Sequence, residues 1–103
     1  MNERDVERYL VKRVKELVGE VRKVKWIGRA GAPDRLVMLP ACGVLHRPSF
    51  RPSASWWVEV KAPGKGATKA QQREHQRMRD YGVCVMVASS LKGVDAMLDS
   101  LLL

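Results

Sequence analysis

The sequence predicts a small α/β fold, a mixed β-sheet flanked by helices, with the elements in the order helix, three strands, helix, strand, helix. Three observations support this prediction. Apolar residues recur at helical spacing near both ends of the chain, short runs of β-branched and aliphatic residues lie between them, and a helix start signal stands at Thr68. Because 103 residues suffice for one core, residues 1–103 are predicted to form a single domain.

The first helix is predicted over residues 3–18, with Gly19 ending it and Val6, Leu10 and Val14 at helical spacing. Glu7 falls within this apolar stripe, where an unpaired carboxylate is costly. Two interpretations of Glu7 stay open. Its side chain reaches solvent at the first turns of the helix, where the helix dipole favours an acid, or it faces a cation.

Three strands are predicted next, at residues 21–27, 35–39 and 56–61, from runs of β-branched, aliphatic and aromatic residues. Two glycines and Pro33 require a loop between the first two strands. Residues 40–55 contain three prolines and are predicted to form a long hairpin connection, with a short strand at Val44 and Leu45 as a further option.

A second helix is predicted over residues 68–81, because Thr68 and Gln71 have the T-x-x-Q spacing of a capping box and Gly82 ends the pattern. The continuous apolar run 83–88 is typical of a strand that is buried on both faces of a sheet. Residues 90–103 are predicted to end the chain as a helix.

The net charge of +8 favours a polyanionic partner such as nucleic acid, although basic proteins also bind anionic membranes and other proteins. The sequence has no apolar stretch of membrane-spanning length, and its charged N-terminus is unlike a signal peptide, so a cytoplasmic protein is expected. Cys42 and Cys84 lack metal-ligand spacing and are expected to be ordinary buried or half-buried thiols.

Asp34, Glu59 and Lys61 form the candidate catalytic set. If the strands that carry the two acids pair as neighbours, both carboxylates converge at one edge of the sheet, and carboxylate oxygens suit Mg²⁺ or Mn²⁺. Side chains alternate along a strand, so Glu59 and Lys61 project from the same face. Such a set can activate water and stabilise the negative charge that builds up as a phosphodiester is hydrolysed. An E-x-K triplet by itself is more often a solvated ion pair on an exposed strand.

The whole motif is more specific than its parts. The runs GAPDRLVMLP and WWVEVKAPGKGATKAQQREHQRMRDYGVCVMVASS, with the opening ERDVERYLVKRVKEL, resemble the VRR-NUC (virus-type replication-repair nuclease) family of the PD-(D/E)XK superfamily. The resemblance covers nearly the whole chain except residues 41–55, where family members usually have a tighter hairpin. It implies a restriction-endonuclease-like PD-(D/E)XK core in the order αβββαβα.

The resemblance also implies a Mg²⁺- or Mn²⁺-dependent endodeoxyribonuclease. Asp34 and Glu59 would be metal ligands together with the main-chain carbonyl of Val60, and Lys61 would be the catalytic lysine. Glu7 matches the acid that the first helix of the family presents to the metal. Gln71 aligns with a family glutamine in the catalytic set, although the capping box also explains it. Small family members from bacteriophages resemble homodimeric enzymes that resolve four-way (Holliday) junctions, and the same domain ends a larger eukaryotic interstrand-crosslink repair nuclease.

Several side chains are candidates for contacts to DNA phosphates: Arg29, Lys65, Lys69 and His75. For His75 a packing role inside the protein is the alternative. Arg47 and Arg51 could contact the DNA backbone from the 41–55 segment, and the alternative is a mobile or dimer-packing loop.

The leading functional hypothesis is a structure-selective DNA endonuclease that acts as a homodimer on branched DNA, in the host cytoplasm if the gene belongs to a phage. Three alternatives remain. They are a nuclease of ordinary duplex DNA (restriction-like or nicking), a non-catalytic basic module that binds nucleic acid, and a protein-interaction domain that uses exposed Trp56 and Trp57. The candidate dimer surfaces are the C-terminal leucines and the first helix, both of which could equally be core.

Overall fold

The computed structural model describes residues 1–102 and confirms the predicted α/β fold and element order. The elements are α1 (Glu3–Glu16), β1 (Glu20–Lys23), β2 (Arg35–Leu39), β3 (Ala54–Val60), α2 (Lys69–Asp80), β4 (Val85–Ala88) and α3 (Leu91–Leu102). The four strands form one sheet in the order β1-β2-β3-β4. β1 pairs with β2 and β2 with β3 in antiparallel fashion, whereas β4 runs parallel to β3, so the sheet is mixed.

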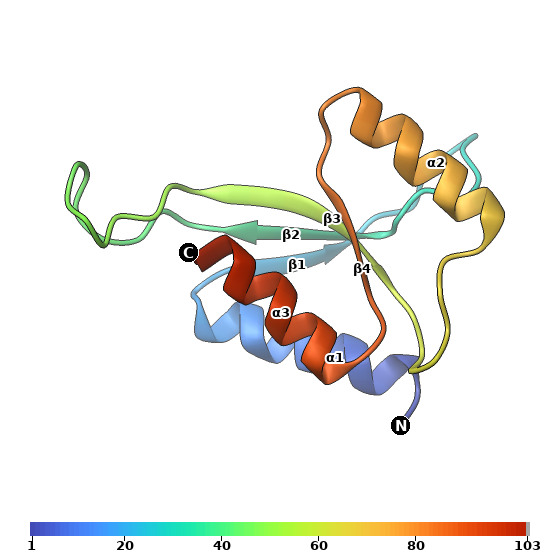
Figure 1. Cartoon of the computed structure of the whole chain (residues 1–103), viewed down its shortest axis with the longest axis horizontal. Coiled ribbons are helices and arrows are strands. Elements are labelled where there is room, and N and C mark those ends of the chain that lie inside the picture. The colour runs from blue at the N-terminus through green and yellow to red at the C-terminus, as the bar shows by residue number, and fades with distance from the viewer. Residues whose placement is uncertain (103) are drawn as a thin grey trace.

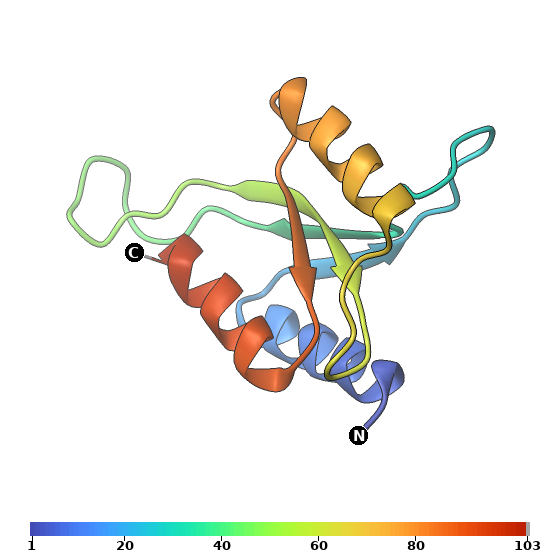
Figure 2. The same cartoon turned by 45° about the vertical axis from the view of Figure 1, so that its right-hand side comes forward.

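Helices α1 and α3 lie side by side on one face of the sheet, and α2 lies on the other side (Figures 1 and 2). The hydrophobic core lies between the sheet and the pair of helices α1 and α3. Its members are apolar residues of α1, α3 and the strands: Val6, Leu10, Val14, Val37, Leu39, Trp56, Val58, Val60, Ala88, Val94, Met97 and Leu98. The apolar side of α1 and the buried residues of α3 therefore belong to the core and are not exposed dimer surfaces.

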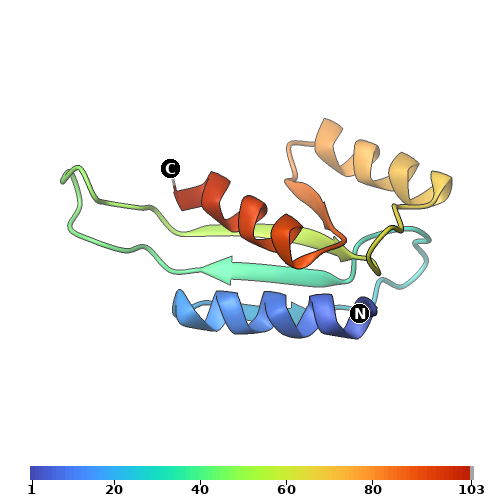
Figure 3. The ribbon, with the colours of Figure 1, turned by 60° about the horizontal axis from the view of Figure 1, so that its bottom comes forward.

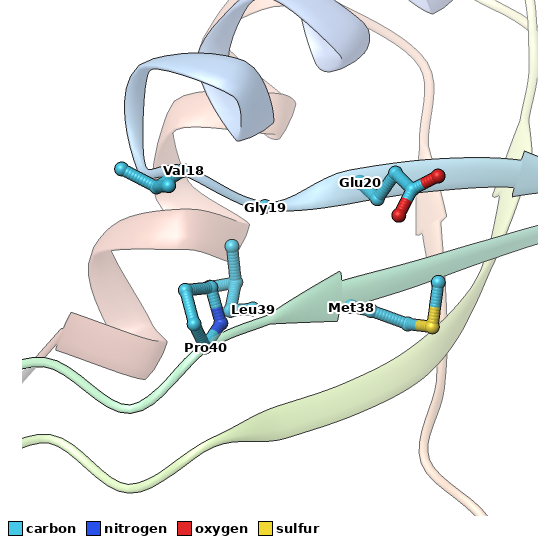
Figure 4. Close-up of a pocket in the computed structure, with 6 residues that line it drawn as sticks. All are labelled: Val18, Gly19, Glu20, Met38, Leu39 and Pro40. Atoms are coloured by element: carbon cyan, nitrogen blue, oxygen red, sulfur yellow. The ribbon is translucent and has the colours of Figure 1, made fainter.

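Helix α1 begins with a capping box between Asn2 and Asp5 and ends two residues earlier than predicted. Its last turn closes at Leu17, and Val18 adopts a left-handed backbone with φ of 62°. Gly19 then passes so close to β2 that a Cβ atom there would lie 2.5 Å from the carbonyl oxygen of Met38. A small pocket of about 290 Å³ opens at this turn, between Val18, Glu20 and Pro40 (Figure 4).

Strand β1 is shorter than the predicted 21–27 segment. After Lys23 the main chain keeps one more bond, from the Val24 amide to the Asp34 carbonyl, and then leaves the sheet. Trp26 turns back to pack on Trp57, with ring centroids 4.9 Å apart. The alternation of residues 21–27 predicted a longer strand. A local pattern does not reveal the contact between Trp26 and Trp57, which lie far apart in the sequence.

The segment between β2 and β3 projects from one end of the sheet, as Figures 1 and 3 show. It contains a single bridge, Cys42 to Arg51, and Val44 and Leu45 are exposed and do not form the optional strand. Strand β3 starts at Ala54, two residues before the prediction.

Two expectations about burial were wrong. β4 is an edge strand paired only with β3, so Val87 is 40% exposed, whereas a strand buried on both faces was predicted. Cys42 and Cys84 are exposed free thiols instead of buried or half-buried ones, because one lies in the projecting hairpin and the other just before this edge strand.

Trp56 is buried in the core and its indole N–H points at the sulfur of Met97 at 3.4 Å. An interaction surface built on exposed Trp56 is therefore wrong. None of the helices in the described part of the chain combines the length and the apolar character that crossing a membrane requires.

Candidate active site

Asp34 and Glu59 are brought together by the pairing of β2 with β3. Arg35 pairs with Val58 in this antiparallel ladder, so Asp34 and Glu59 are the next residues opposite each other at the end of the pair. Directly opposed residues of antiparallel strands point to the same face, with Cβ atoms about 5 Å apart. The charge of Asp34 is also one of the causes that raise the pKa of Glu59. The pairing of these two strands, on which the predicted convergence of the acids depended, is thus present.

Glu59 lies in surroundings that oppose its ionisation. Burial raises the pKa of Glu59 to about 7, the nearby cation Lys61 opposes this shift, and Asp34 adds to it. Only 7% of the residue is exposed to solvent. A divalent cation bound beside Glu59 would favour the charged form of that acid, because a nearby opposite charge offsets the cost of burial.

His75 supports Glu59 from helix α2. Its Nε2 lies 3.2 Å from Oε1 of Glu59, and the ring is 1% exposed. Burial lowers the pKa of His75, and the positive charge of Arg79 acts in the same direction. The predicted contact of His75 with a DNA phosphate is wrong for this structure, because the ring is packed inside the protein, as the alternative interpretation expected.

Lys61 follows Glu59 by two residues and continues its face of the strand. Its amide donates to the Ala88 carbonyl at 2.9 Å, which extends the β3–β4 pairing by one bond and fixes the backbone at this point. The residue is half-buried, and its charge acts on both Glu59 and His75. The ammonium group therefore belongs to the same electrostatic cluster as the two acids.

Arg35 is the residue of this site that sequence reasoning missed. Its Nη2 lies 2.8 Å and its Nε 3.1 Å from Oε1 of Glu7, and its Nη1 lies 2.8 Å from Oδ1 of Asp34 without hydrogen-bond geometry. Arg35 thus bridges α1 to the start of β2. Of the two interpretations of Glu7, the structure supports the one in which it faces a cation. A signal existed, because Arg35 stands at a strand position whose companions Val37 and Leu39 face the core.

A divalent metal fits this donor set if two carboxylates and several waters are enough to bind it. Within residues 1–102, no three side chains of the His, Cys, Asp or Glu type form a group that could hold a metal ion. The carboxylate of Glu7 is paired with Arg35, and its role as a direct metal ligand stays a prediction. Two carboxylates still suit Mg²⁺, which commonly binds one or two carboxylates and keeps several waters.

The remaining predicted residues lie around this centre. Gln71 completes the predicted capping box of α2, since its Oε1 accepts from the Thr68 amide at 2.9 Å. Arg29 is 44% exposed at its side chain and is held by Glu74 at 3.0 Å. Lys65 and Lys69 are exposed, one in the loop after β3 and the other at the start of α2. The loop that carries Arg29 and Asp34 contacts α2 directly.

Gly31 makes that contact. It has a φ of 81°, and a Cβ atom at this position would lie 2.9 Å from the carbonyl oxygen of Ala70. Both its backbone angle and its close approach to α2 therefore require glycine. The glycine-rich loop that the sequence identified only as a break between strands is thus packed against the beginning of α2.

Comparisons with known proteins agree with this fold. No protein-family model matches the chain. A solved structure described as "VRR_NUC domain" is 38% identical, superposes with a TM-score of 0.73 and is matched over 94% of each chain. A protein of Acyrthosiphon pisum secondary endosymbiont phage 1, named "Putative nuclease p44", is 37% identical over 90 residues, which are 87% of this chain and 85% of the relative. The chain therefore belongs to the VRR-NUC family of PD-(D/E)XK nucleases.

Proposed function

We propose that this nuclease is a Mg²⁺- or Mn²⁺-dependent endonuclease that hydrolyses phosphodiester bonds of DNA, with branched or four-way junctions as its substrates. The observation that carries the proposal is the register of β2 against β3, which sets Asp34 opposite Glu59 with Lys61 on the same face. The name of the phage relative supports a nuclease over a binding module without catalysis. The net charge of +8 supports a polyanionic substrate.

Each residue of the centre has a role in this proposal. Asp34, Glu59 and the main-chain carbonyl of Val60 would hold the cation. When bound there, a divalent cation would supply Lewis-acid chemistry: a lower pKa for a water and polarisation of the phosphate. Lys61 orients the attacking water and offsets the negative charge that develops on the phosphate oxygens. His75 fixes the carboxyl group of Glu59, and Arg35 fixes that of Asp34. Gln71, at the start of α2, joins the catalytic set in this proposal, and Lys65, Lys69 and Arg29 contact flanking phosphates.

The test compares cleavage of four DNA forms that share one sequence: linear duplex, single strand, flap and four-way junction. Each is incubated with and without Mg²⁺ or Mn²⁺. Wild type is compared with Glu59→Ala and Lys61→Ala, and the matched controls are Glu20→Ala and Lys92→Ala, which replace an exposed acid and an exposed lysine away from the centre. We expect cleavage by wild type and both controls to need the metal and to favour the junction.

Glu59→Ala and Lys61→Ala should lose at least about 100-fold in cleavage rate while they still bind the junction, because a lost electrostatic contact in the transition state has a cost of this order. Equal cleavage by wild type and both site variants would assign the activity to a contaminant. Binding without cleavage by wild type in every metal would favour the non-catalytic module. Cleavage of linear duplex as fast as of the junction would favour the restriction-like alternative.

A homodimer is part of the proposal, because a four-way junction offers two scissile strands related by approximate two-fold symmetry and a two-fold dimer presents two matching sites. Sedimentation tests this. A species of twice the 11.6 kDa chain mass is expected, and a monomer at micromolar concentration, both alone and on the junction, would contradict it.

A further inference from the structure

A pocket of about 440 Å³ lies directly beside Asp34. Its lining includes one aromatic side chain, Trp26, and three cationic ones, Lys23, Lys25 and Arg29. The volume falls in the range of about 300–1,000 Å³ that is common for small-ligand sites. The proposed reaction gives Arg29 a flanking phosphate but gives no role to Trp26, Lys23 or Lys25, which line the same cavity beside Asp34.

Trp26 is held as a rigid wall of this pocket. Its indole N–H donates to the Pro33 carbonyl at 2.8 Å, and its ring packs on Trp57 with a centroid distance of 4.9 Å and a tilt of 49°. The residue still keeps 37% of its surface exposed. The ring is thus fixed by two contacts on the protein side and is available on the pocket side.

The cations are placed around this ring. Lys23 and Lys25 are exposed, and Arg29 is oriented by Glu74, a carboxylate that is itself buried. An aromatic face with flanking cations is the combination that binds single-stranded nucleic acid, because a base stacks on the ring while its neighbouring phosphates meet the positive charges. A base inside a duplex is already stacked and paired, so it cannot lie on Trp26 unless it leaves the helix.

We propose that this pocket binds one unpaired nucleotide of the DNA strand, next to the phosphate that is cut at Asp34. That the neighbouring phosphate is the one that is cut rests on the proposed function, whereas the binding of the base in the pocket does not. Flaps contain unpaired nucleotides, and a base at a branch point leaves the helix at a lower cost than a base inside an intact duplex. The pocket therefore supplies a physical basis for a preference for branched over linear DNA.

The test measures binding in the presence of a metal chelator, so that it does not depend on cleavage. A single-stranded oligonucleotide and a flap that each carry one 2-aminopurine are titrated with wild type, Trp26→Ala and Trp26→Phe, and a blunt duplex serves as reference. Ile27→Ala is the matched control, because Ile27 is adjacent in sequence and 95% exposed but does not line the pocket. Ala32→Phe is a second variant that fills the pocket from another of its walls.

Trp26→Ala and Ala32→Phe should weaken binding of the single strand and flap about 5- to 150-fold, which corresponds to the loss of one stacked base. They should change duplex binding less than about twofold, while Trp26→Phe and Ile27→Ala bind like wild type. Quenching of 2-aminopurine should disappear with Trp26→Ala. Equal losses on duplex and single strand, or unchanged binding by Ala32→Phe, would overturn the pocket. If wild type cuts no DNA and the two variants still lose binding selectively, the proposed function is rejected and the pocket proposal stands.

Discussion

The carboxyl group of Glu59 is held between opposing influences. Burial raises its pKa to about 7, Lys61 opposes the shift, and the charge of Asp34 adds to it. The side chain nevertheless keeps a partner, because Nε2 of His75 lies 3.2 Å away. Such a group is destabilising when it is ionised without a cation. This explains in physical terms why a buried acid beside a second acid points to a metal centre.

The raised pKa of Glu59 predicts how the metal-free protein responds to pH. Between the ordinary value of 4.5 and about 7, the folded state binds more protons at Glu59 than the unfolded state does. The contribution of protonated Glu59 to the free energy of unfolding is therefore complete below pH 4.5 and is lost as the pH rises through 7. At a pH well above 7, Glu59→Gln should exceed wild type in free energy of unfolding by roughly 1–3 kcal/mol, as measured by urea unfolding.

The titration of His75 determines the pH range in which this measurement isolates Glu59. Its pKa is lowered below 6.5, so its own contribution is lost as the pH falls, opposite in sign to that of Glu59. Above pH 7 both states hold His75 neutral, and the comparison isolates Glu59. Added Mg²⁺ should stabilise wild type there and leave Glu59→Gln unchanged. An advantage of Glu59→Gln that is the same near pH 4.5 and above 7 would show that the charge of Glu59 is not its cause.

Asp34, Glu59 and Lys61 could be predicted from the sequence, because strand periodicity fixes which residues share a face and carboxylates suit a hard cation. Arg35 and His75 could not be assigned in the same way. The partner of Arg35 comes from α1 and that of His75 from β3, and only the packed fold brings these elements together. Glu7 illustrates the limit: the sequence identified an acid in an apolar stripe but not which cation it meets.

At the scale of elements, α1 is tied to the start of β2 by one ion pair. Glu7 comes from the first turns of α1, Arg35 is the first residue of β2, and the guanidinium group also lies against Asp34. Arg35 is largely shielded from solvent at 8% exposure. The position of the Asp34 carboxylate therefore depends on a contact that helix α1 makes through Arg35.

The ion pair between Glu7 and Arg35 predicts that Glu7→Gln weakens catalysis indirectly, through Asp34. Without the charge of Glu7, Arg35 pairs more strongly with Asp34 and competes with the cation. We expect about 10- to 100-fold weaker Mg²⁺ activation, which is typical when the partner of a metal ligand is lost, with a smaller change in the rate at saturating metal. Cleavage rates across a Mg²⁺ titration measure this. Glu16→Gln, an exposed acid at the other end of α1, is the control, and equal Mg²⁺ dependence of both variants would contradict this role of the ion pair.

The helices were easier to predict than the strands. The capping box at Thr68 and the glycine after α2 fixed the ends of that helix to within one residue, because these signals act locally. The end of β1 and the exposure of β4 depend on neighbours far away in the sequence. An apolar run such as residues 83–88 does not reveal whether its strand lies in the middle or at the edge of a sheet.

At the scale of the whole molecule, strand β2 separates the candidate active site from the hairpin that carries Arg47 and Arg51. Asp34 precedes β2 and the projecting hairpin follows it, so the candidate active site and the hairpin lie at opposite ends of the sheet (Figure 1). A five-residue strand spans roughly 17 Å, and the molecule is 42 Å long in its longest direction. A DNA arm that reaches both regions must extend about five base pairs or more beyond the cut.

Arg47, exposed in the hairpin, tests whether the protein uses this length. If it contacts a phosphate, Arg47→Ala should lower the slope of log Kd against log salt concentration by about 0.9 on junctions with long arms, because one counterion fewer is released. On arms of only a few base pairs the slope should equal that of wild type, since such DNA ends before the hairpin. Arg8→Ala, which removes an exposed arginine from α1, is the matched control and should leave both slopes unchanged. A decrease that is equal on short and long arms, or no decrease on either, would mean that the hairpin does not follow the DNA.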